Sequence, residues 1–232
     1  MMLNWRRNGG FDPEDEERLA VADDGSFELW RTIGWSAVGR FSGTLADQTR
    51  DLLHAAVDAA ADAGPYEGRV PHGAATEIYD LGEQDGAEVY AVLGGSDDPG
   101  GGWQRLVDLV RDLVQGELLR SPSAAVVLGV ADGGHAVHLQ HAGDEPLVLD
   151  LSAVQIQATR MDATERLDEA WSATLAAGTD AETAGPGWTL DLPLDHSLPG
   201  GDGAKVQLRV FFGLRDGITL RTAQLGTTTA LS

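Results

Sequence analysis

Histidines in the segment HAVHLQH form the densest group of potential metal ligands or catalytic bases in the chain. His135, His138 and His141 lie three residues apart. On a strand, residues three apart point to opposite faces, so these side chains would not converge on one metal ion. A helix would bring them to one face, but glycines flank the segment on both sides and disfavour a helix. An exposed strand is the expected structure, a metal site is the less favoured alternative, and we assign no metal ligand here.

Motifs for nucleophilic catalysis and for phosphate binding are missing from the sequence. There is no G-x-S-x-G or S-x-x-K motif, and the absence of cysteine removes thiol nucleophiles, disulfides and thiolate metal ligands. Glycine-rich stretches at 94–95 and 100–102 precede a helical pattern, but no G-K-[ST] follows, and Asp97 and Asp98 would repel a phosphate. A flexible loop is the favoured interpretation. We therefore predict no catalytic residue and no cofactor.

Aromatic and arginine side chains near residue 35 are the remaining candidates for function. Trp30 belongs to an alternating strand pattern and is expected in the core. Trp35 lies in a looser, glycine-containing stretch. Because interface hot spots are enriched in Trp and Arg, we predict that Arg31, Trp35 and Arg40 contribute to a protein interface. The alternative is that Trp35 is packed in the core, as most tryptophans are.

The composition restricts the classes of partner. The 232 residues carry a formal charge of −21, which repels nucleic-acid phosphates and anionic lipid headgroups and suits a protein partner with a basic surface. No apolar run approaches the length of a membrane span, and the N-terminus lacks the apolar region of a secretory signal. We therefore expect a cytoplasmic protein without nucleic-acid or membrane partners. The scarcity of lysine, present only as Lys205, indicates a GC-rich bacterial coding sequence.

Two amphipathic helices are predicted in the first half of the chain. Across residues 103–120, apolar residues recur at steps of three and four and share one helical face. They are Trp103, Leu106, Val107, Val110, Leu113 and Val114. A second helix is expected from Thr44, a weak N-terminal cap, to the stop signal at Gly64. Asp-Gly turns predict hairpins within 19–30 and 76–93, with a further strand at 33–41, so the order is β-β-β-α-β-β-α.

The second half repeats parts of this pattern after residues 121–123, a short polar segment that we interpret as a boundary. A hairpin around 131–134 and strands within 146–156, 188–194, 206–212 and 218–225 are expected, together with a helix over 162–175 that begins with a capping box. VADDGS resembles VADGGH, and DGAEV resembles DGAKV. These matches suggest an internal duplication, although the same turn residues recur in unrelated proteins.

Together these patterns predict an α+β fold of two β-β-α-β-β-like units, with antiparallel sheets each covered by helices. The expected divisions are a polar N-terminal lead-in at 1–18, a first unit at 19–120, a second unit at 124–226 and a C-terminal tail at 227–232. The lead-in contains an acidic run, 12–17, that is expected to remain solvated.

Part of the first half resembles a known family. The segment FELWRTIGWSAVGRF, the helix that follows it, the hairpin at 85–86 and the pattern P-x₃-W-x₂-L-V-x-L span residues 27–113. Their order resembles the emfourin-like family of small inhibitors of protealysin-type metallopeptidases. The glycine-rich stretch of that family corresponds only loosely to residues 31–37. The resemblance implies inhibition of a peptidase, and it transfers no individual contact residue.

These observations favour a non-catalytic, acidic protein that binds another protein. It would be an accessory or assembly subunit, or a peptidase inhibitor. The alternative is an enzyme or small-ligand-binding protein whose site consists of dispersed Asp, Glu and His residues. An exposed apolar patch around Trp35 would favour the first hypothesis, and a concave pocket with two carboxylates would favour the second.

Overall fold

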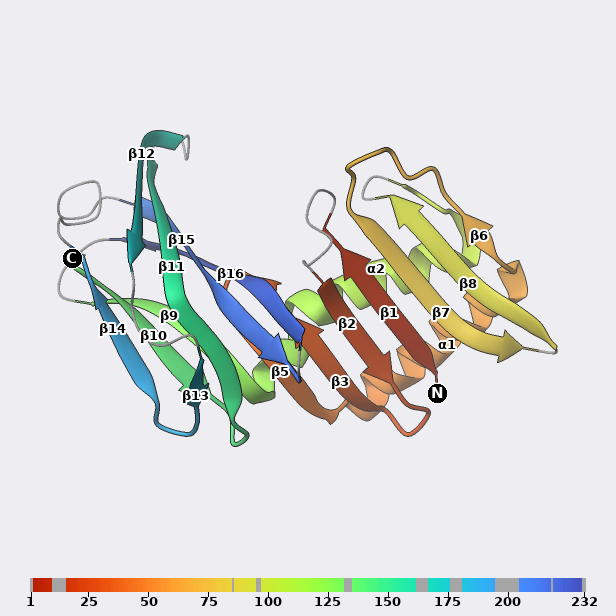
Figure 1. Ribbon diagram of the computed structural model, residues 1–232. Coiled ribbons are helices and arrows are strands. Elements are labelled where there is room, and N and C mark those ends of the chain that lie inside the picture. The colour runs from red at the N-terminus through yellow and green to blue at the C-terminus, as the bar shows by residue number, and fades with distance from the viewer. Residues whose placement is uncertain are drawn as a thin grey trace. The chain divides into compact units, whose positions relative to one another are not determined.

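The computed structural model describes residues 2–9, 16–84, 86–94, 97–131, 135–161, 167–175, 181–194, 205–217 and 219–230. The chain divides into two compact units (Figure 1). Unit 1 comprises residues 1–31 and 40–121, and unit 2 comprises residues 32–39 and 122–232. Within the described ranges, no helix is both long and apolar enough to cross a lipid bilayer.

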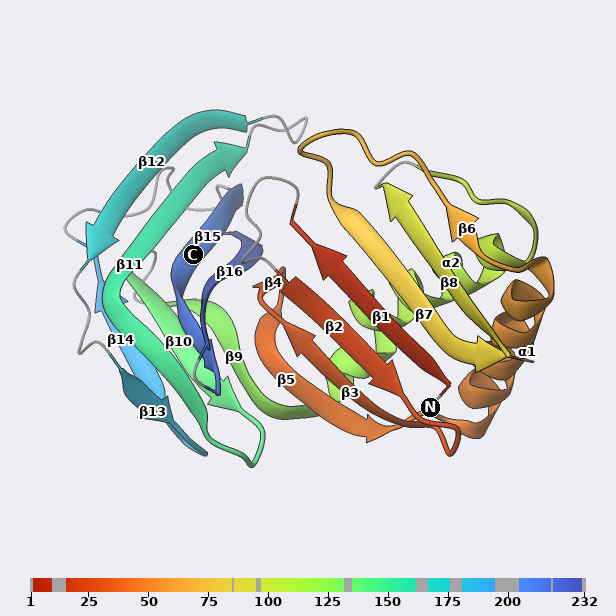
Figure 2. The same cartoon turned by 45° about the vertical axis from the view of Figure 1, so that its right-hand side comes forward.

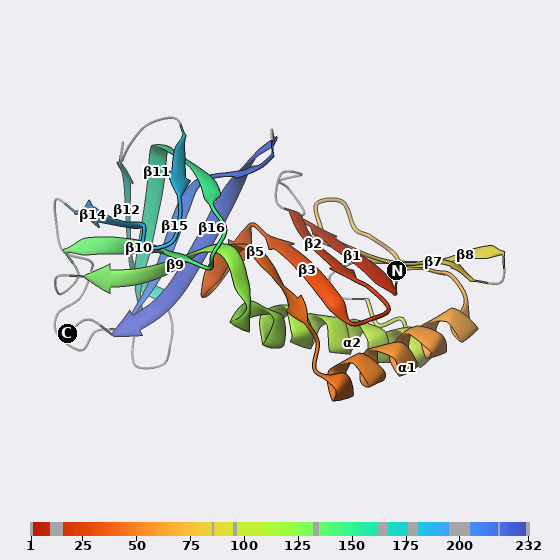
Figure 3. The ribbon, with the colours of Figure 1, turned by 90° about the horizontal axis from the view of Figure 1, so that it is seen from below.

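Unit 1 is a sheet with two helices on one of its faces (Figure 3). Its strands are β1 (Leu3–Asn8), β2 (Glu16–Val21), β3 (Ser26–Arg31), β5 (Ala37–Thr44), β6 (Tyr66–Glu67), β7 (Thr76–Gln84) and β8 (Ala87–Gly94). They are ordered β5-β3-β2-β1-β7-β8-β6. The helices are α1 (Asp47–Ala63) and α2 (Gly101–Gln115), and a short 3-10 helix, η1 (Glu117–Arg120), follows α2. β1 thus lies in the middle of the sheet, between β2 and β7.

Helix α2 provides much of the core of unit 1. The six apolar residues that the sequence placed on one helical face are all buried. Burial of a large apolar side chain contributes about 1.5–3 kcal/mol, so this face is a major source of stability. Trp103 also donates a hydrogen bond from Nε1 to the carbonyl of Gly64 (2.7 Å), at the end of α1. Its ring meets Tyr79 of β7 edge-on, with centroids 6.5 Å apart.

Unit 2 is built from strands in its described residues. They are β4 (Ile33–Gly34), β9 (Pro122–Ala131), β10 (Ala136–Ala142), β11 (Leu147–Met161), β12 (Leu167–Leu175), β13 (Glu182–Ala184), β14 (Thr189–Pro193), β15 (Lys205–Asp216) and β16 (Thr219–Ala230). One sheet has the order β12-β11-β15-β16-β4, with β13 paired to β11, and its long strands curve along their length (Figure 2). A second group of paired strands has β10 in the middle, with β14 on one side and β9 on the other.

Alternation along the long strands separates two faces of this sheet. On β15, Val206, Leu208 and Val210 are buried, whereas Gln207 and Arg209 between them are half-buried. β11 follows the same rule, apart from a register shift between Asp150 and Gln155. On β16, Ala223 and Leu225 are buried on the same side, and Gly226 is also buried although it lies on the opposite side. A period of two is what a strand requires when one face packs into a core. The buried side is the inner face, and the opposite side is the outer face.

The predicted α+β fold with helix-covered sheets in both units is wrong. Strands dominate the protein, and both α-helices of the described chain belong to unit 1. The expected helix over 162–175 is contradicted by β12, which pairs antiparallel with β11; its capping segment, 162–165, lies outside the described residues. The apolar residues at 167, 171, 173 and 175 also fit a period of two, and pairing with β11 selects the strand.

The suggested duplication is wrong for the same reason, because unit 1 contains two helices and the described part of unit 2 contains none. The ends of the chain also differ from expectation. Residues 3–8 of the supposed lead-in form β1, and β16 extends to Ala230 through most of the supposed tail. The acidic run 12–17 falls largely outside the described residues, as do the turn at 132–134 and the DGAKV match at 202–204.

Candidate functional site

The three residues predicted to form an interface do not share one structural unit. Arg31 and Arg40 belong to unit 1, and Trp35 belongs to unit 2. Arg31 is buried and Arg40 is half-buried, whereas the side chain of Trp35 is 49% exposed. Trp35 is therefore the one of the three with the accessibility expected of an interface anchor.

Arg31 is buried and makes contacts inside unit 1. Its Nε lies 2.8 Å from Oε1 of Glu17, the residue directly opposite it on β2. Its Nη1 donates to the carbonyl of Val114 (3.0 Å), near the C-terminal end of α2. Burial lowers the pKa of Arg31, and the charge of Glu17 counteracts that shift. Arg31 therefore connects the sheet of unit 1 to α2.

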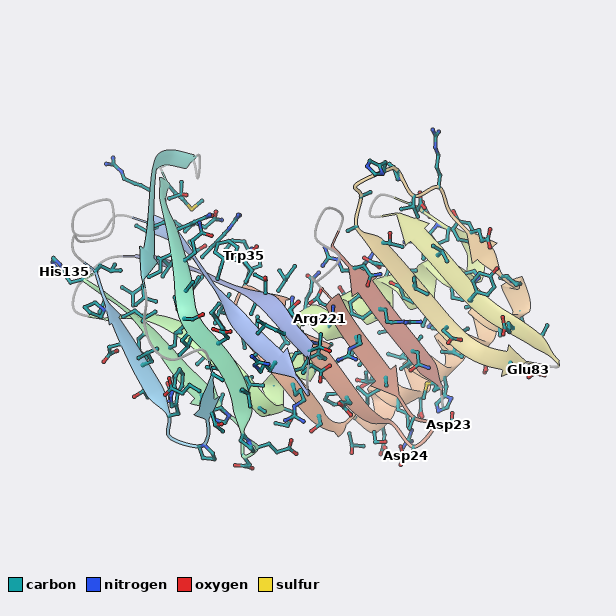
Figure 4. All side chains as sticks on the ribbon, viewed as in Figure 1. Asp23, Asp24, Trp35, Glu83, His135 and Arg221 are labelled. Atoms are coloured by element: carbon teal, nitrogen blue, oxygen red, sulfur yellow. The ribbon has the colours of Figure 1, made fainter. Side chains whose placement is uncertain are left out.

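Trp35 follows the two-residue strand β4 at the border of the sheet of unit 2, beside β15 and β16 (Figure 4). Its indole lies against the backbone of Gly226 on β16, where a methyl group would come within 2.8 Å of Cε3. The guanidinium of Arg209 lies 5.5 Å from the ring centroid. Arg209 and Gly226 are directly opposite each other on β15 and β16. The indole is thus supported by glycine and by a cation–π contact, and half of its surface remains exposed.

Trp35 lies at the border of the outer face of this sheet, and we call this face the Trp35 face. Its described residues on β11, β15 and β16 are Gln155, Gln157, Thr159, Lys205, Gln207, Arg209, Phe211, Arg215, Leu220, Thr222, Gln224 and Thr228, with Asp150 near the register shift. Among these described residues, Asp150 alone is acidic, whereas three are basic. The Trp35 face is therefore locally basic and amide-rich on a chain whose formal charge is −21.

Asp150 is held by its own turn. Ser152 donates to Oδ1 of Asp150 from its hydroxyl (2.6 Å) and from its backbone nitrogen (3.1 Å). These hydrogen bonds lower the pKa of Asp150, and the charge of Arg215 lowers it further. Asp150 is thus engaged locally, and Arg209 lies farther along β15, opposite Gln157 and Gly226 in the strand register.

Sequence reasoning found Trp35 but missed Arg209 and Gly226, which support it. They lie far along the chain, and nothing local to residue 35 indicates them. The signal for the face itself was present, because polar and apolar residues alternate from Lys205 to Val210 in KVQLRVFFGLRD. A polar side rich in glutamine and arginine, with one phenylalanine, could have been identified there as the exposed surface of a strand.

The two histidines of β10, His138 and His141, point to opposite sides of the strand, as residues three apart on a strand do. Nδ1 of His138 lies 2.6 Å from Oδ1 of Asp191, which is directly opposite it on β14. His141 points to the other side, is buried, and its Nε2 is 2.9 Å from the carbonyl of Glu145. In the ranges that the structure describes, no three His, Cys, Asp or Glu side chains are grouped as metal ligands; His196 lies outside those ranges.

Comparison of the chain with models of known protein families finds no match, and comparison with curated proteins finds none either. The site is therefore defined here by its own geometry.

Proposed function

We propose that this is a non-catalytic, acidic protein-binding protein that contacts its partner through the Trp35 face. The observation that supports this most directly is the fixed but half-exposed indole of Trp35. An exposed tryptophan that is already held in place loses little conformational freedom on binding, so more of its burial energy is available for affinity. Tryptophan and arginine are also the residues most enriched at interface hot spots.

The charge of the Trp35 face indicates which surface groups the partner should carry. The whole chain attracts a basic partner at long range. At the Trp35 face, however, Nε of Arg209 has no hydrogen-bond partner among the described residues, and its guanidinium favours an acceptor or a carboxylate on the partner. We therefore expect a partner with an acidic or acceptor-rich contact patch, surrounded by a basic surface. We expect neither nucleic acid nor a membrane as the partner, and we place the interaction in the cytoplasm.

The partner defines which version of this function applies. An accessory or assembly subunit would bind another component of a complex. Peptidase inhibition, which the emfourin-like resemblance implies, would require a metallopeptidase as the partner.

A capture experiment with matched variants tests the proposal. The intact protein, Trp35→Ala and Leu52→Ala are immobilised and exposed to a bacterial lysate at low and high salt. Leu52, on α1 of unit 1, is 41% exposed and matches Trp35 in accessibility. We expect one stoichiometric partner to be retained by the intact protein and by Leu52→Ala, and to be lost from Trp35→Ala.

The other outcomes are also informative. Equal retention of the partner by all three proteins would show that the partner binds at a surface other than the Trp35 face. Retention of no protein at either salt concentration would contradict the binding function. A retained metallopeptidase would support the inhibitor version.

A further inference from the structure

Four charged residues form a row across the sheet of unit 1. Arg31, Glu17, Arg7 and Glu77 lie directly opposite one another on the neighbouring strands β3, β2, β1 and β7. Their charges alternate along the row. The next row on the same face is Leu29, Leu19, Trp5 and Tyr79, all buried. The charged row therefore forms the border of the apolar core of unit 1.

The row is buried to an extent that is unusual for ionised groups. Glu17, Arg31 and Glu77 are all buried, and the side chain of Arg7 is 45% exposed. Glu17 is shared by two arginines: Nε of Arg31 is 2.8 Å from Oε1, and Nη1 of Arg7 donates to Oε2 across 3.2 Å. Buried charges of this kind persist only when they are paired.

Helix α2 adds a third arginine to the group. Nε of Arg111 donates to both carboxylate oxygens of Glu77, at 3.1 and 3.3 Å. The hydroxyl of Tyr79 donates to Oε2 of Glu77 across 2.7 Å. Burial, followed by the charge of Glu77, raises the pKa of Tyr79 and keeps its hydroxyl protonated as a donor. Both oxygens of Glu77 are therefore occupied by donors from the protein, whereas Oε1 of Glu17 is paired with Arg31 by charge and makes no hydrogen bond among the described residues.

The four residues of the charged row and Arg111 line a cavity of about 220 Å³. Trp5, Ala75, Val114 and Gln115 complete its walls. The space is smaller than a drug-sized ligand needs, but it can hold several waters or one small molecule. Three guanidinium groups and two carboxylates face one another here, so the group has a surplus of one positive charge.

Hydrogen-bond donors are also in surplus. Each guanidinium has five N–H groups and accepts none. Nη2 of Arg111 is buried and has no hydrogen-bond partner among the described residues. Arg7 is half exposed and uses Nη1 on Glu17. Because an unsatisfied buried donor is costly, the arrangement favours an additional acceptor beside Arg7 and Arg111.

We propose that this cavity is a binding site for a small oxyanion, a carboxylate or a phosphate, held between Arg7 and Arg111. Arginine is suited to both groups because its planar fork donates two parallel hydrogen bonds to them. Glu17 and Glu77 act as positioning residues, since they hold the guanidinium groups in place. The site lies entirely within unit 1 and is independent of the Trp35 face.

Calorimetric titration of the full chain with inorganic phosphate and, separately, with succinate tests this proposal and distinguishes the two oxyanions. The variants are Arg7→Gln and Arg111→Gln, with Arg105→Gln as the matched control, because Arg105 is an exposed arginine of α2 outside the cavity. We expect saturable binding of at least one anion by the intact protein and by Arg105→Gln. Affinity should fall tenfold or more in Arg7→Gln or Arg111→Gln.

Two results would overturn the site. One is the absence of saturable binding of either anion by the intact protein. The other is a loss smaller than tenfold in both cavity variants. Arg111→Gln removes a partner of a buried carboxylate and could impair folding, and in that case Arg7→Gln, at a half-exposed position, decides the test alone.

Discussion

The indole of Trp35 lies so close to the backbone of Gly226 that a methyl group at position 226 would come within 2.8 Å of Cε3. Gly226 is in a strand conformation that alanine can adopt, since its φ is not positive. Gly226→Ala should therefore act by displacing the indole, at a cost of about 1–3 kcal/mol typical of overpacking. In a Trp35→Ala background the same substitution should cost almost nothing, and urea denaturation of the four proteins measures the difference.

Gly185→Ala is the control for this cycle, because a methyl group at position 185 would meet no atom within 4 Å. It should leave the free energy of unfolding within about 0.5 kcal/mol of the original value, as surface substitutions usually do. An equal cost of Gly226→Ala with and without the indole would show that Trp35 does not lie against Gly226 in solution.

Arg31 and Glu17 offer a second cycle, at the charged row of unit 1. Arg31→Met leaves the buried carboxylate of Glu17 paired with the half-exposed Arg7 in the row. Breaking a buried ion pair from one side costs about 3–5 kcal/mol, whereas replacing both partners by apolar residues is often nearly neutral. Arg31→Met should therefore destabilise the protein by about 3 kcal/mol, and Arg31→Met with Glu17→Met by clearly less. Denaturant unfolding measures the free energy of unfolding of each variant. A loss in the double variant equal to the sum of the losses in Arg31→Met and Glu17→Met would contradict the pairing.

Tyr79 makes the stability of unit 1 sensitive to high pH. Its pKa is raised in the folded protein, first by burial and then by Glu77, whereas an unfolded tyrosine titrates near pH 10. Below about pH 10 both states keep the proton and the full stability is present. Above it the unfolded state loses the proton first, so the free energy of unfolding falls by about 1.4 kcal/mol per pH unit. Between pH 9 and 11 the original protein should lose about 1.4 kcal/mol more than Tyr79→Phe, and identical losses would contradict the raised pKa.

How well the sequence predicted the fold depends on whether the information was local. Helix α2 was predictable because its buried stripe repeats within one segment and no other period fits it. Strand β12 was not, because the apolar positions of 167–175 suit both a helix and a strand, and pairing with β11 selects between them. β1 was overlooked because most of its residues are asparagine or arginine, yet Leu3 and Trp5 alternate into the core.

The candidate sites depend even more on contacts between distant parts of the chain, which the sequence does not reveal. Trp35 could be selected as an exposed aromatic residue, but Arg209 and Gly226 reach it only through the pairing of β15 with β16 and of β16 with β4. Arg31 was selected as an interface residue, and the structure instead places it in a buried ion pair with Glu17. The charged row cannot be read from the sequence, since its four members come from four strands whose register is a tertiary property.

Gly102 provides a test in which two effects predict opposite signs. The sequence indicated a flexible glycine loop before α2, but Gly102 lies inside the first turn of that helix. A methyl group there would lie 1.9 Å from the carbonyl oxygen of Ala59 on α1. Helix propensity alone predicts that Gly102→Ala stabilises the protein by about 1 kcal/mol. The clash involves backbone, which cannot rotate away, so we expect a net destabilisation of about 2 kcal/mol as α1 and α2 are forced apart. Thermal and urea unfolding give the sign directly, and a stabilised Gly102→Ala protein would show that the two helices do not pack this closely.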